Sequence, residues 1–384
     1  MRILHTADWH LGRMLGGMDL LELQEYALEQ LIAMARDQRP DAIVIAGDVY
    51  DRSVPPEHAI GLLDETLMRL REVAPVLAIA GNHDSGERLQ FGAGLLRQAG
   101  VFVAGTSYDG AMRVDLEDRF GKVAFHLMPY SLPSDVRAAL DLPDLRTHHE
   151  AIAARVENCD MSGTDRHVLV AHLFAAGGQA TEDSERDISV GGSSAVESHL
   201  FDRFCYTALG HLHRPHRIGT DRIQYSGSLC RYSFAEQSHR KCCVMLELDG
   251  EGKVTFERLE LPQKLGMRTL HGAAEDLLLL ANQDLRRNQD LIRIELTDLT
   301  VPFGARERLK DLYPFLLELD LKRTVQPTDW TGDGEVTEQK KQEPPAQKVE
   351  QFLRERFKDR DLSEHLRLAA EWMEKAQQQE GGPR

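Results

Sequence analysis

The chain has 384 residues, and its 46 basic and 62 acidic side chains give a formal net charge of −16. Its hydrophobic content of 42% is ordinary for a globular enzyme, and no apolar run is long enough to span a bilayer, which argues against a membrane protein. The acidic balance argues against a free-standing nucleic-acid-binding protein, but it leaves DNA open as a substrate because metals and a partner can supply positive charge.

Five short apolar runs in the first half of the chain are typical of buried strands, and each ends at polar residues of a metal-binding type. The runs cover residues 2–6, 42–46, 76–80, 167–170 and 206–209. Between them, apolar residues at three- and four-residue spacing predict helices over 21–35 and 59–70. Strands that alternate with helices predict an α/β sheet, whose ligands gather beyond the carboxyl ends of the strands. We therefore expect the polar residues to converge there.

The chain after residue 265 lacks these polar strand ends. Apolar runs predict strands over 267–271, 291–296 and 315–321, with helices over 273–282 and 305–312. A segment rich in Pro, Gly and charge follows, and after it come apolar stripes at helical spacing. The predicted organisation is a core at 1–265, a small α/β cap domain at 266–325, a linker at 326–345 and a C-terminal helix pair at 346–384.

The polar clusters combine carboxylate, imidazole and amide-oxygen donors, which suit divalent metals that activate water on a phosphate. The two-residue spacing in DWH and HLH places both donors of each motif on the same side of an extended chain. One such cluster is weak support, because a strand-end histidine is more often structural than a ligand. Five clusters in this order are hard to explain structurally. The candidate ligands are Asp8, His10, Asp48, Asn82, His172, His211 and His213.

The order D-x-H, G-D-x-x-D, G-N-H-D, His and G-H-x-H resembles the calcineurin-like metallophosphoesterase superfamily. The resemblance implies a four-layer α/β sandwich, in which helices flank two mixed β-sheets, and a two-metal site. It further implies that His83 protonates the leaving oxygen and that Asp84 orients His83 through its second ring nitrogen. One metal would be held by Asp8, His10, Asp48 and His213, and the other by Asp48, Asn82, His172 and His211.

Longer segments, including ILHTADWHLGR, AGDVYDRSVPP and ALGHLHRPHRI, resemble the SbcD family of bacterial DNA repair nuclease subunits. This resemblance implies a double-strand exonuclease and single-strand or hairpin endonuclease. The mixed donors favour Mn²⁺ as the cofactor, with Mg²⁺ as the alternative. The implied partners are DNA and an SbcC-type, SMC-like ATPase that the terminal helices would dock on, in a heterotetramer built around a homodimer.

The expected location is the cytoplasm, in association with the nucleoid. The N-terminus has no charged and apolar regions of a signal peptide. The five cysteines are odd in number and form no CxxC pair, which suits a reducing compartment.

Several alternatives stay open on the sequence alone. Cyclic nucleotides or other small phosphodiesters could be the substrate, and the GDVYDR segment is similar to phosphoprotein phosphatases, although these usually carry GNHE in place of GNHD. A scaffold with a vestigial metal site is disfavoured because all ligand positions are filled. Arg13 and Arg52 are candidate phosphate-binding residues, and Arg214 and Arg217 also flank the motifs. Each of the four could instead be a surface or salt-bridged arginine, and this alternative has less weight for Arg13 than for the other three. Asp51 is expected to lie near the site without binding metal.

Overall fold

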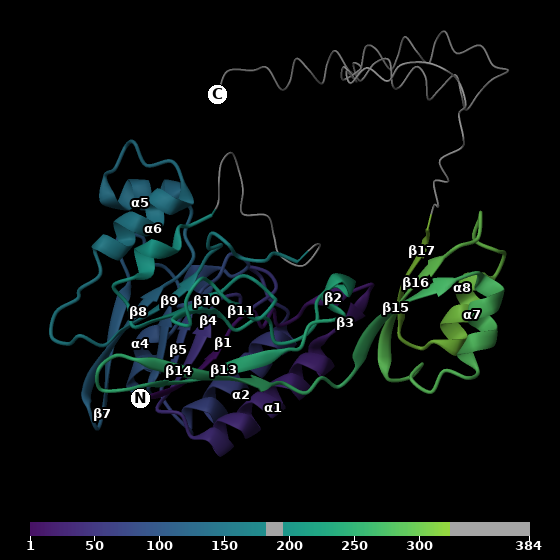
Figure 1. Cartoon of the computed structure of the whole chain (residues 1–384), viewed down its shortest axis with the longest axis horizontal. Helices are drawn as coiled ribbons and strands as arrows, with labels where there is room; N and C mark the ends of the chain where they lie inside the picture. The colour runs from purple at the N-terminus through teal and green to yellow at the C-terminus, as the bar shows by residue number, and fades with distance from the viewer. Residues whose placement is uncertain (182–194, 323–384) are drawn as a thin grey trace, which may run out of the picture. The chain divides into compact units, whose positions relative to one another are not determined.

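Two six-stranded mixed β-sheets form the centre of the fold (Figure 1). The structure is a computed structural model and describes residues 1–181 and 195–322. The first sheet has the order β14-β13-β1-β4-β5-β6, and the second has the order β11-β12-β10-β9-β8-β7. The strands of the first sheet are β1 (Arg2–Thr6), β4 (Ala42–Ala46), β5 (Val76–Ile79), β6 (Val101–Ala104), β13 (Cys242–Leu248) and β14 (Val254–Glu260). Those of the second are β7 (Met112–Asp118), β8 (Gly121–Met128), β9 (His167–His172), β10 (Tyr206–Gly210), β11 (His216–Arg217) and β12 (Ile223–Tyr225).

Each sheet contains a run of four parallel strands, so the carboxyl ends of these strands share one edge. β1, β4, β5 and β6 run parallel, and so do β8, β9, β10 and β12. The remaining strands, β13 and β14 of the first sheet and β7 and β11 of the second, pair in the antiparallel direction. Four of the five predicted strand runs end within one residue of the observed strand. The fifth, predicted over 167–170, continues through His172.

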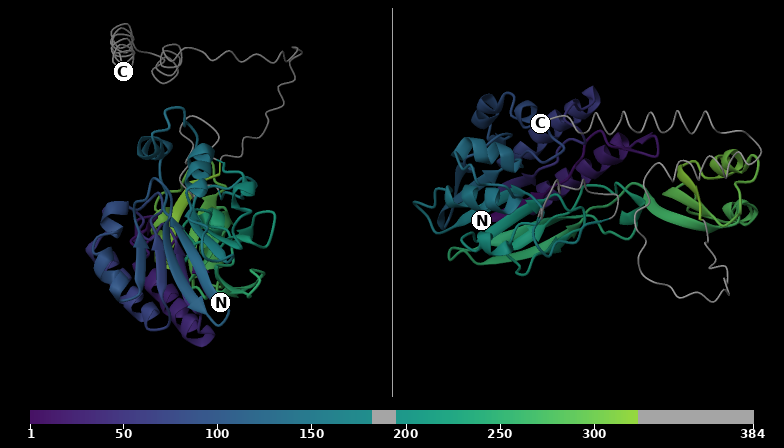
Figure 2. Two further views of the ribbon diagram at one scale, coloured as in Figure 1. Left: turned by 90° about the vertical axis from the view of Figure 1, so that its left-hand side faces the viewer. Right: turned by 90° about the horizontal axis from the view of Figure 1, so that it is seen from above.

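Alternating side chains give the sandwich its layers, because successive residues of a strand point to opposite faces. In β1, Leu4 packs under the helices that cover the outer face, whereas Ile3 belongs to the core between the two sheets. The second sheet repeats this pattern, with Val168 and Val170 inside and Leu169 on its outer face. These cores confirm the predicted arrangement of helix, sheet, sheet and helix, and Figure 2 shows the layers edge-on.

The helices lie on the outer faces of this sandwich. The first sheet is covered by α1 and α2, which extend a few residues beyond the predicted ranges, and by the short α3 and α4. On the second sheet, α6 and a 3₁₀ turn pack on the outer face, and α5 packs on α6. Their bounds are α1 (Leu21–Gln38), α2 (Glu57–Arg71), α3 (Gly86–Leu89), α4 (Ala93–Gln98), α5 (Pro133–Leu140), α6 (His148–Glu157) and the 3₁₀ turn η1 (Ser198–Phe201).

A three-stranded parallel sheet follows the sandwich, with two helices and its own apolar core. It contacts the sandwich through a small hairpin and a 3₁₀ turn: Leu15 and Met18 of the hairpin and Phe234 of the turn pack with Met267 and Leu291. Its elements are β15 (Gly266–Gly272), α7 (Ala274–Ala281), β16 (Asp290–Leu296), α8 (Ala305–Leu312) and β17 (Leu316–Leu321). The contacting elements are β2 (Met14–Leu15), β3 (Met18–Asp19) and η2 (Phe234–Glu236).

The predicted linker at 326–345 and helix pair at 346–384 lie outside the described residues. Within the described ranges, no helix is long and apolar enough to cross a membrane.

Candidate metal centre

In the loops that follow β1, β4 and β10, several polar residues have a positive φ angle, which residues other than glycine rarely adopt. Asp8, His10, Asp48 and His211 have φ angles of 53°, 45°, 49° and 107°. Non-glycine residues with positive φ are uncommon and cost free energy, and they cluster at functional sites. Backbone hydrogen bonds hold two of these residues: the Asp8 amide donates to the Gly47 carbonyl, and the His10 amide donates to the Asp48 carbonyl, both at 3.0 Å.

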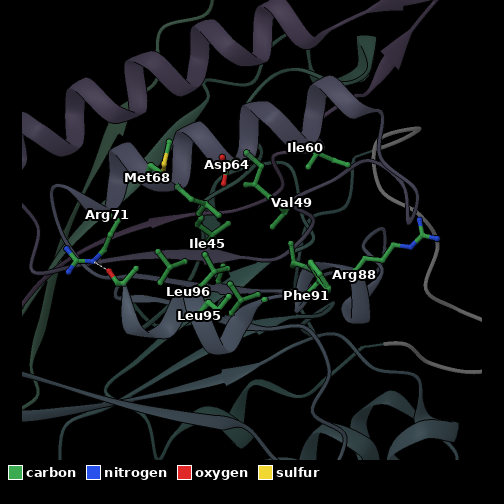
Figure 3. A pocket seen from close by; sticks show the side chains of 18 of the residues that line it. Ile45, Val49, Ile60, Asp64, Met68, Arg71, Arg88, Phe91, Leu95 and Leu96 are labelled. Carbon is green, nitrogen blue, oxygen red and sulfur yellow. Dashed lines mark hydrogen bonds between the residues drawn. The ribbon is translucent and has the colours of Figure 1, made fainter.

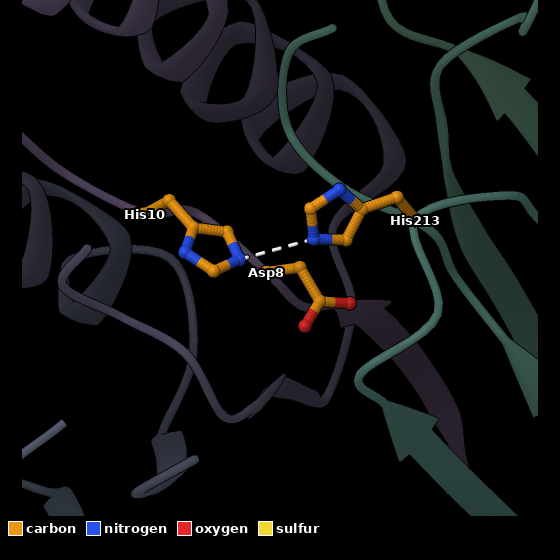
Figure 4. Close-up of side chains that lie close together, drawn as sticks. All are labelled: Asp8, His10 and His213. Atoms are coloured by element: carbon orange, nitrogen blue, oxygen red, sulfur yellow. Dashed lines mark hydrogen bonds between the residues drawn. The ribbon is translucent and has the colours of Figure 1, made fainter. Parts of the chain in front are cut away.

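The first group of candidate ligands lies where β1 and β10 end. The Nε2 atoms of His10 and His213 are 3.1 Å apart, and Figure 4 shows the two rings facing each other with Asp8 beside them. Potential ligand atoms of Asp8, His10 and His213 all lie within 4.8 Å of one another. All three side chains are buried.

The second group lies where β4, β5, β9 and β10 end. Asn82 Oδ1 is 3.0 Å from His172 Nε2 and 3.2 Å from His211 Nδ1. The other nitrogen of His172, Nδ1, lies 2.9 Å from the carbonyl oxygen of Ala46, which accepts its proton and leaves Nε2 facing the site.

Asp48 stands between the two groups. Its Oδ2 atom is 3.5 Å from His10 Nε2 in the first group and 3.4 Å from His172 Nε2 in the second. Its other oxygen, Oδ1, accepts a hydrogen bond from the His83 amide at 2.9 Å, which fixes the orientation of the carboxylate. One carboxylate oxygen is therefore in reach of donors from both groups, as the shared ligand of a two-metal site must be.

His83 and Asp84 differ from the expected pairing. The Nδ1 atom of His83 donates to the carbonyl oxygen of Asp51 at 2.8 Å, and its Nε2 atom lies 4.0 Å from Asp48 Oδ2. The carboxylate of Asp84 instead accepts hydrogen bonds from the amides of Val49, Tyr50 and Gly81, at 2.8–3.1 Å. The expected contact between Asp84 and the His83 ring is therefore wrong: Asp84 ties together the loops after β4 and β5, and a backbone carbonyl orients His83.

The two candidate phosphate-binding arginines have different surroundings. Arg13 Nη1 is bound to Asp51 Oδ1 at 2.8 Å, and the same oxygen lies 3.6 Å from His10 Nδ1. Asp51 thus lies beside the Nδ1 atom of His10, while the other ring nitrogen, Nε2, faces His213. Arg52 is exposed next to Asp51.

Buried residues outside the motifs form hydrogen bonds that hold the candidate ligands and their loops in place. Glu236 of η2 accepts from His213 Nδ1 at 3.0 Å and pairs with Lys241, and both of these charged residues are fully buried. Gln24 of α1 donates to the carbonyl oxygens of Trp9 and His10, which holds the loop after β1. A buried Glu–Lys pair and a buried Gln have no local sequence signature, because their partners are distant in the chain.

The electrostatics of the site favour neutral imidazoles, with one exception. Burial lowers the pKa of His10, His211 and His213, and neutral imidazole is the form that binds metals. Burial alone would also lower the pKa of His172, but the adjacent Asp48 carboxylate outweighs this effect and raises the pKa of His172 to about 9. Burial and the charge of Asp48 raise the pKa of Asp84 to about 7.

The donor set fits divalent metal ions. Three imidazole and oxygen donors converge on each side of Asp48, and no thiolate lies among them. This composition is expected for Mn²⁺, Fe²⁺ or Zn²⁺ and not for a structural thiolate site. A fold of this kind with two donor groups that share a carboxylate defines a metal-dependent hydrolase of phosphoesters.

Comparisons with known proteins agree with this class of protein. The chain belongs to the calcineurin-like phosphoesterase family, whose family model matches residues 1–215. Relatives named as the D subunit of the nuclease SbcCD cover 83% of this chain. The one from Staphylococcus epidermidis is 32% identical over 323 residues and 85% of its own length. The one from Staphylococcus saprophyticus is 34% identical over 330 residues and 84% of its length.

Among solved structures, TT1561 of Thermus thermophilus matches 67% of this chain and 98% of its own at 14% identity, with a TM-score of 0.34. This likeness is too distant to add to the assignment.

Proposed function

We propose that the chain is an Mn²⁺-dependent DNA nuclease that hydrolyses phosphodiester bonds at a two-metal site, as a double-strand exonuclease and a single-strand or hairpin endonuclease. The observation that carries the proposal is Asp48 Oδ2, which lies 3.4–3.5 Å from a nitrogen of each ligand group. When bound, two divalent ions would supply an activated water and stabilise the charge that develops on the phosphate.

The side chains have separate roles in this proposal. The seven candidate ligands hold the ions, and the positive φ angles at Asp8, His10, Asp48 and His211 fix their geometry before substrate arrives. His83 donates a proton to the leaving oxygen from Nε2, because its Nδ1 is committed to the Asp51 carbonyl. Asp84 positions the loops that carry Asp48 and His83.

The choice of DNA rests on the relatives, whose name assigns them to the nuclease SbcCD. We propose an SbcC-type, SMC-like ATPase as the partner, with residues 346–384 as the docking segment. Such a partner would also offset the net charge of −16, which is unfavourable for DNA binding by the isolated chain.

We further propose that two copies of the chain associate through an apolar groove of about 570 Å³ between α2 and α4 (Figure 3). Phe91 and Leu95 in the groove are 88% and 75% exposed, which is unfavourable for an uncovered surface. The rim carries both Asp64 and Arg71. In a two-fold dimer the same surface of both copies is in contact. A surface that carries both signs of charge can therefore pair with the same surface of a second copy.

The nuclease proposal is tested with a panel of substrates and a His83→Gln variant. Wild-type protein and Mn²⁺ are incubated, with and without the partner ATPase, with end-labelled duplex DNA, a DNA hairpin, a cyclic nucleotide and bis(p-nitrophenyl) phosphate. We expect cleavage of both DNAs. His83→Gln should lower kcat on DNA by about 10²–10⁴-fold, the usual contribution of a general acid, while calorimetry shows Mn²⁺ binding unchanged within a few-fold.

Turnover of the cyclic nucleotide without cleavage of either DNA, even with the partner present, would replace the nuclease with a small-phosphodiester hydrolase. If His83→Gln cut DNA at the wild-type rate, the assigned role of His83 would be wrong although the metal site could stand.

A further inference from the structure

A second polar pocket, of about 450 Å³, lies beside the metal centre. It is lined by the turn after His213, by the start of β13 and by the end of β14; the lining residues are Arg214, Pro215, Ser238, His239, Arg240, Cys242, Arg258 and Glu260. We refer to it as the arginine pocket. The motifs of the metal centre do not account for it, because none of the seven candidate ligands lines it.

The arginine pocket opens at the same edge of the sandwich as the metal centre. β13 is antiparallel to β1, with His5 opposite Val244, so the start of β13 lies beside the end of β1, where Asp8 and His10 follow. Lys241, next to Arg240, donates to the carbonyl oxygen of His213 at 3.0 Å. The backbone of one candidate ligand therefore separates the pocket from the metal centre, and Arg214 is its immediate neighbour in the chain.

The charge of the arginine pocket is opposite to that of the chain as a whole. Three exposed arginines line it with one acid, Glu260, which leaves two net positive charges where the whole chain carries −16. Within the described residues, Arg214 and Arg240 form no ion pair with an acid. The buried Lys241 adds nothing to this sum because Glu236 neutralises it.

The residues of the arginine pocket differ in charge state and in how firmly they are held. Burial and the neighbouring Lys241 lower the pKa of His239 to about 4, so the ring is neutral at pH 7. Arg258 is anchored, since its Nη2 donates to Gln224 Oε1 at 2.8 Å across the seam between the two sheets. Arg240 is exposed and has no such anchor among residues 1–181 and 195–322, so its guanidinium is available to a ligand.

We propose that the arginine pocket binds a phosphodiester group of the nucleic acid on one side of the bond that is cut. Guanidinium groups bind phosphate oxygens through paired, charge-assisted hydrogen bonds, and such contacts fix the register of a nucleic-acid backbone without reading its sequence. A strand held over the metals would place an adjoining phosphate among Arg214, Arg240 and Arg258. This inference rests on the proposed nuclease function and assigns it a further contact with the substrate.

The test compares DNA with a substrate too small to reach the arginine pocket. Full-length Arg240→Ala and Arg240→Glu variants are assayed with Mn²⁺ on labelled duplex DNA and on bis(p-nitrophenyl) phosphate. DNA binding is followed by fluorescence anisotropy over a range of salt concentrations. The matched control is Arg222→Ala, an exposed arginine at the opposite end of β12 from the site, 3.9 Å from Asp202.

We expect Arg240→Ala to weaken DNA binding by about 3–10-fold and to lower the slope of log K against log salt by about one, with a larger loss for Arg240→Glu. Hydrolysis of bis(p-nitrophenyl) phosphate should stay within about twofold of wild type. The inference fails if the Arg240 variants bind DNA as tightly as Arg222→Ala does. It also fails if their hydrolysis of the small substrate falls by the same factor as their hydrolysis of DNA. A wild-type protein that neither binds nor cuts DNA would instead refute the nuclease function itself.

Discussion

At the scale of single residues, the buried pair of Glu236 and Lys241 determines how His213 can bind a metal. Glu236 accepts the Nδ1 proton of His213 at 3.0 Å, which leaves Nε2 deprotonated and turned toward His10. Burial alone would raise the pKa of Glu236, but the charge of Lys241 and the hydrogen bond from His213 hold it well below its usual range. Carboxylates in this position commonly fix the tautomer of a ligand histidine and raise its basicity.

We therefore expect Glu236→Gln to weaken Mn²⁺ binding by about 10–100-fold, the usual effect of losing such a partner. The same change leaves the Lys241 ammonium buried without its counter-charge, and we expect it to lower the free energy of unfolding by about 3–5 kcal/mol. Titration calorimetry measures the first effect, and chemical denaturation of the metal-free protein measures the second.

The double variant Glu236→Gln/Lys241→Met separates the two effects. It removes the uncompensated charge of Lys241, but His213 still lacks the carboxylate that accepts its Nδ1 proton. Stability should recover in part while metal affinity stays low. Recovery of both to wild-type values would mean that Glu236 supports only folding and does not position His213.

At the scale of secondary-structure elements, the metal centre exists because strands from two different sheets approach each other at their carboxyl ends. β4 belongs to the first sheet and β9 and β10 to the second, yet His172 of β9 donates to the carbonyl of Ala46 in β4. Gly210, the last residue of β10, faces the same carbonyl: a Cβ atom there would lie 1.9 Å from the Ala46 oxygen. The absence of a side chain at Gly210 permits this approach.

Gly210→Ala should force β4 and β10 apart at the centre of the site. We expect a loss of about 1–3 kcal/mol in unfolding free energy from overpacking, together with weaker Mn²⁺ binding because His172 and His211 move relative to Asp48. Gly110→Ala is the matched control, since its added methyl would meet Asn158 only at 3.7 Å. Equal stability and equal metal affinity in the two variants would show that the close approach is not required.

These elements also mark what the sequence could predict. The strands that carry Asp8, Asp48 and Asn82 were predicted because an apolar run and the polar residues after it are local patterns. The sequence could not predict the hydrogen-bond partners of Asp84. The Asp84 carboxylate binds amides from the loops after two strands, and only the folded sheet brings these loops together. Glu236 was missed for the same reason: it reaches His213 through a 3₁₀ turn with no repeating pattern.

At the scale of the whole molecule, a groove on the described part of the chain gathers large apolar side chains that a single copy exposes to water. Phe91, Leu95 and Met68 are 88%, 75% and 59% exposed and line one groove over α2 and α4 (Figure 3). Burial of such side chains in a two-fold contact would stabilise a dimer by about 25 cal/mol for each Å² of apolar surface removed from water. This face lies on the helical layer over the first sheet.

We expect wild-type protein to sediment as a dimer, at twice the 43.3 kDa of one chain, and Leu95→Glu to sediment as a monomer because it would bury two unpaired carboxylates at the contact. Leu285→Glu is the control, since Leu285 is 92% exposed but lies outside the groove. Leu95→Glu should keep its activity on bis(p-nitrophenyl) phosphate, because neither α2 nor α4 carries a candidate ligand. A dimer that survives Leu95→Glu, or a wild-type protein that is monomeric at tens of micromolar, would contradict the assignment of this groove to a second copy.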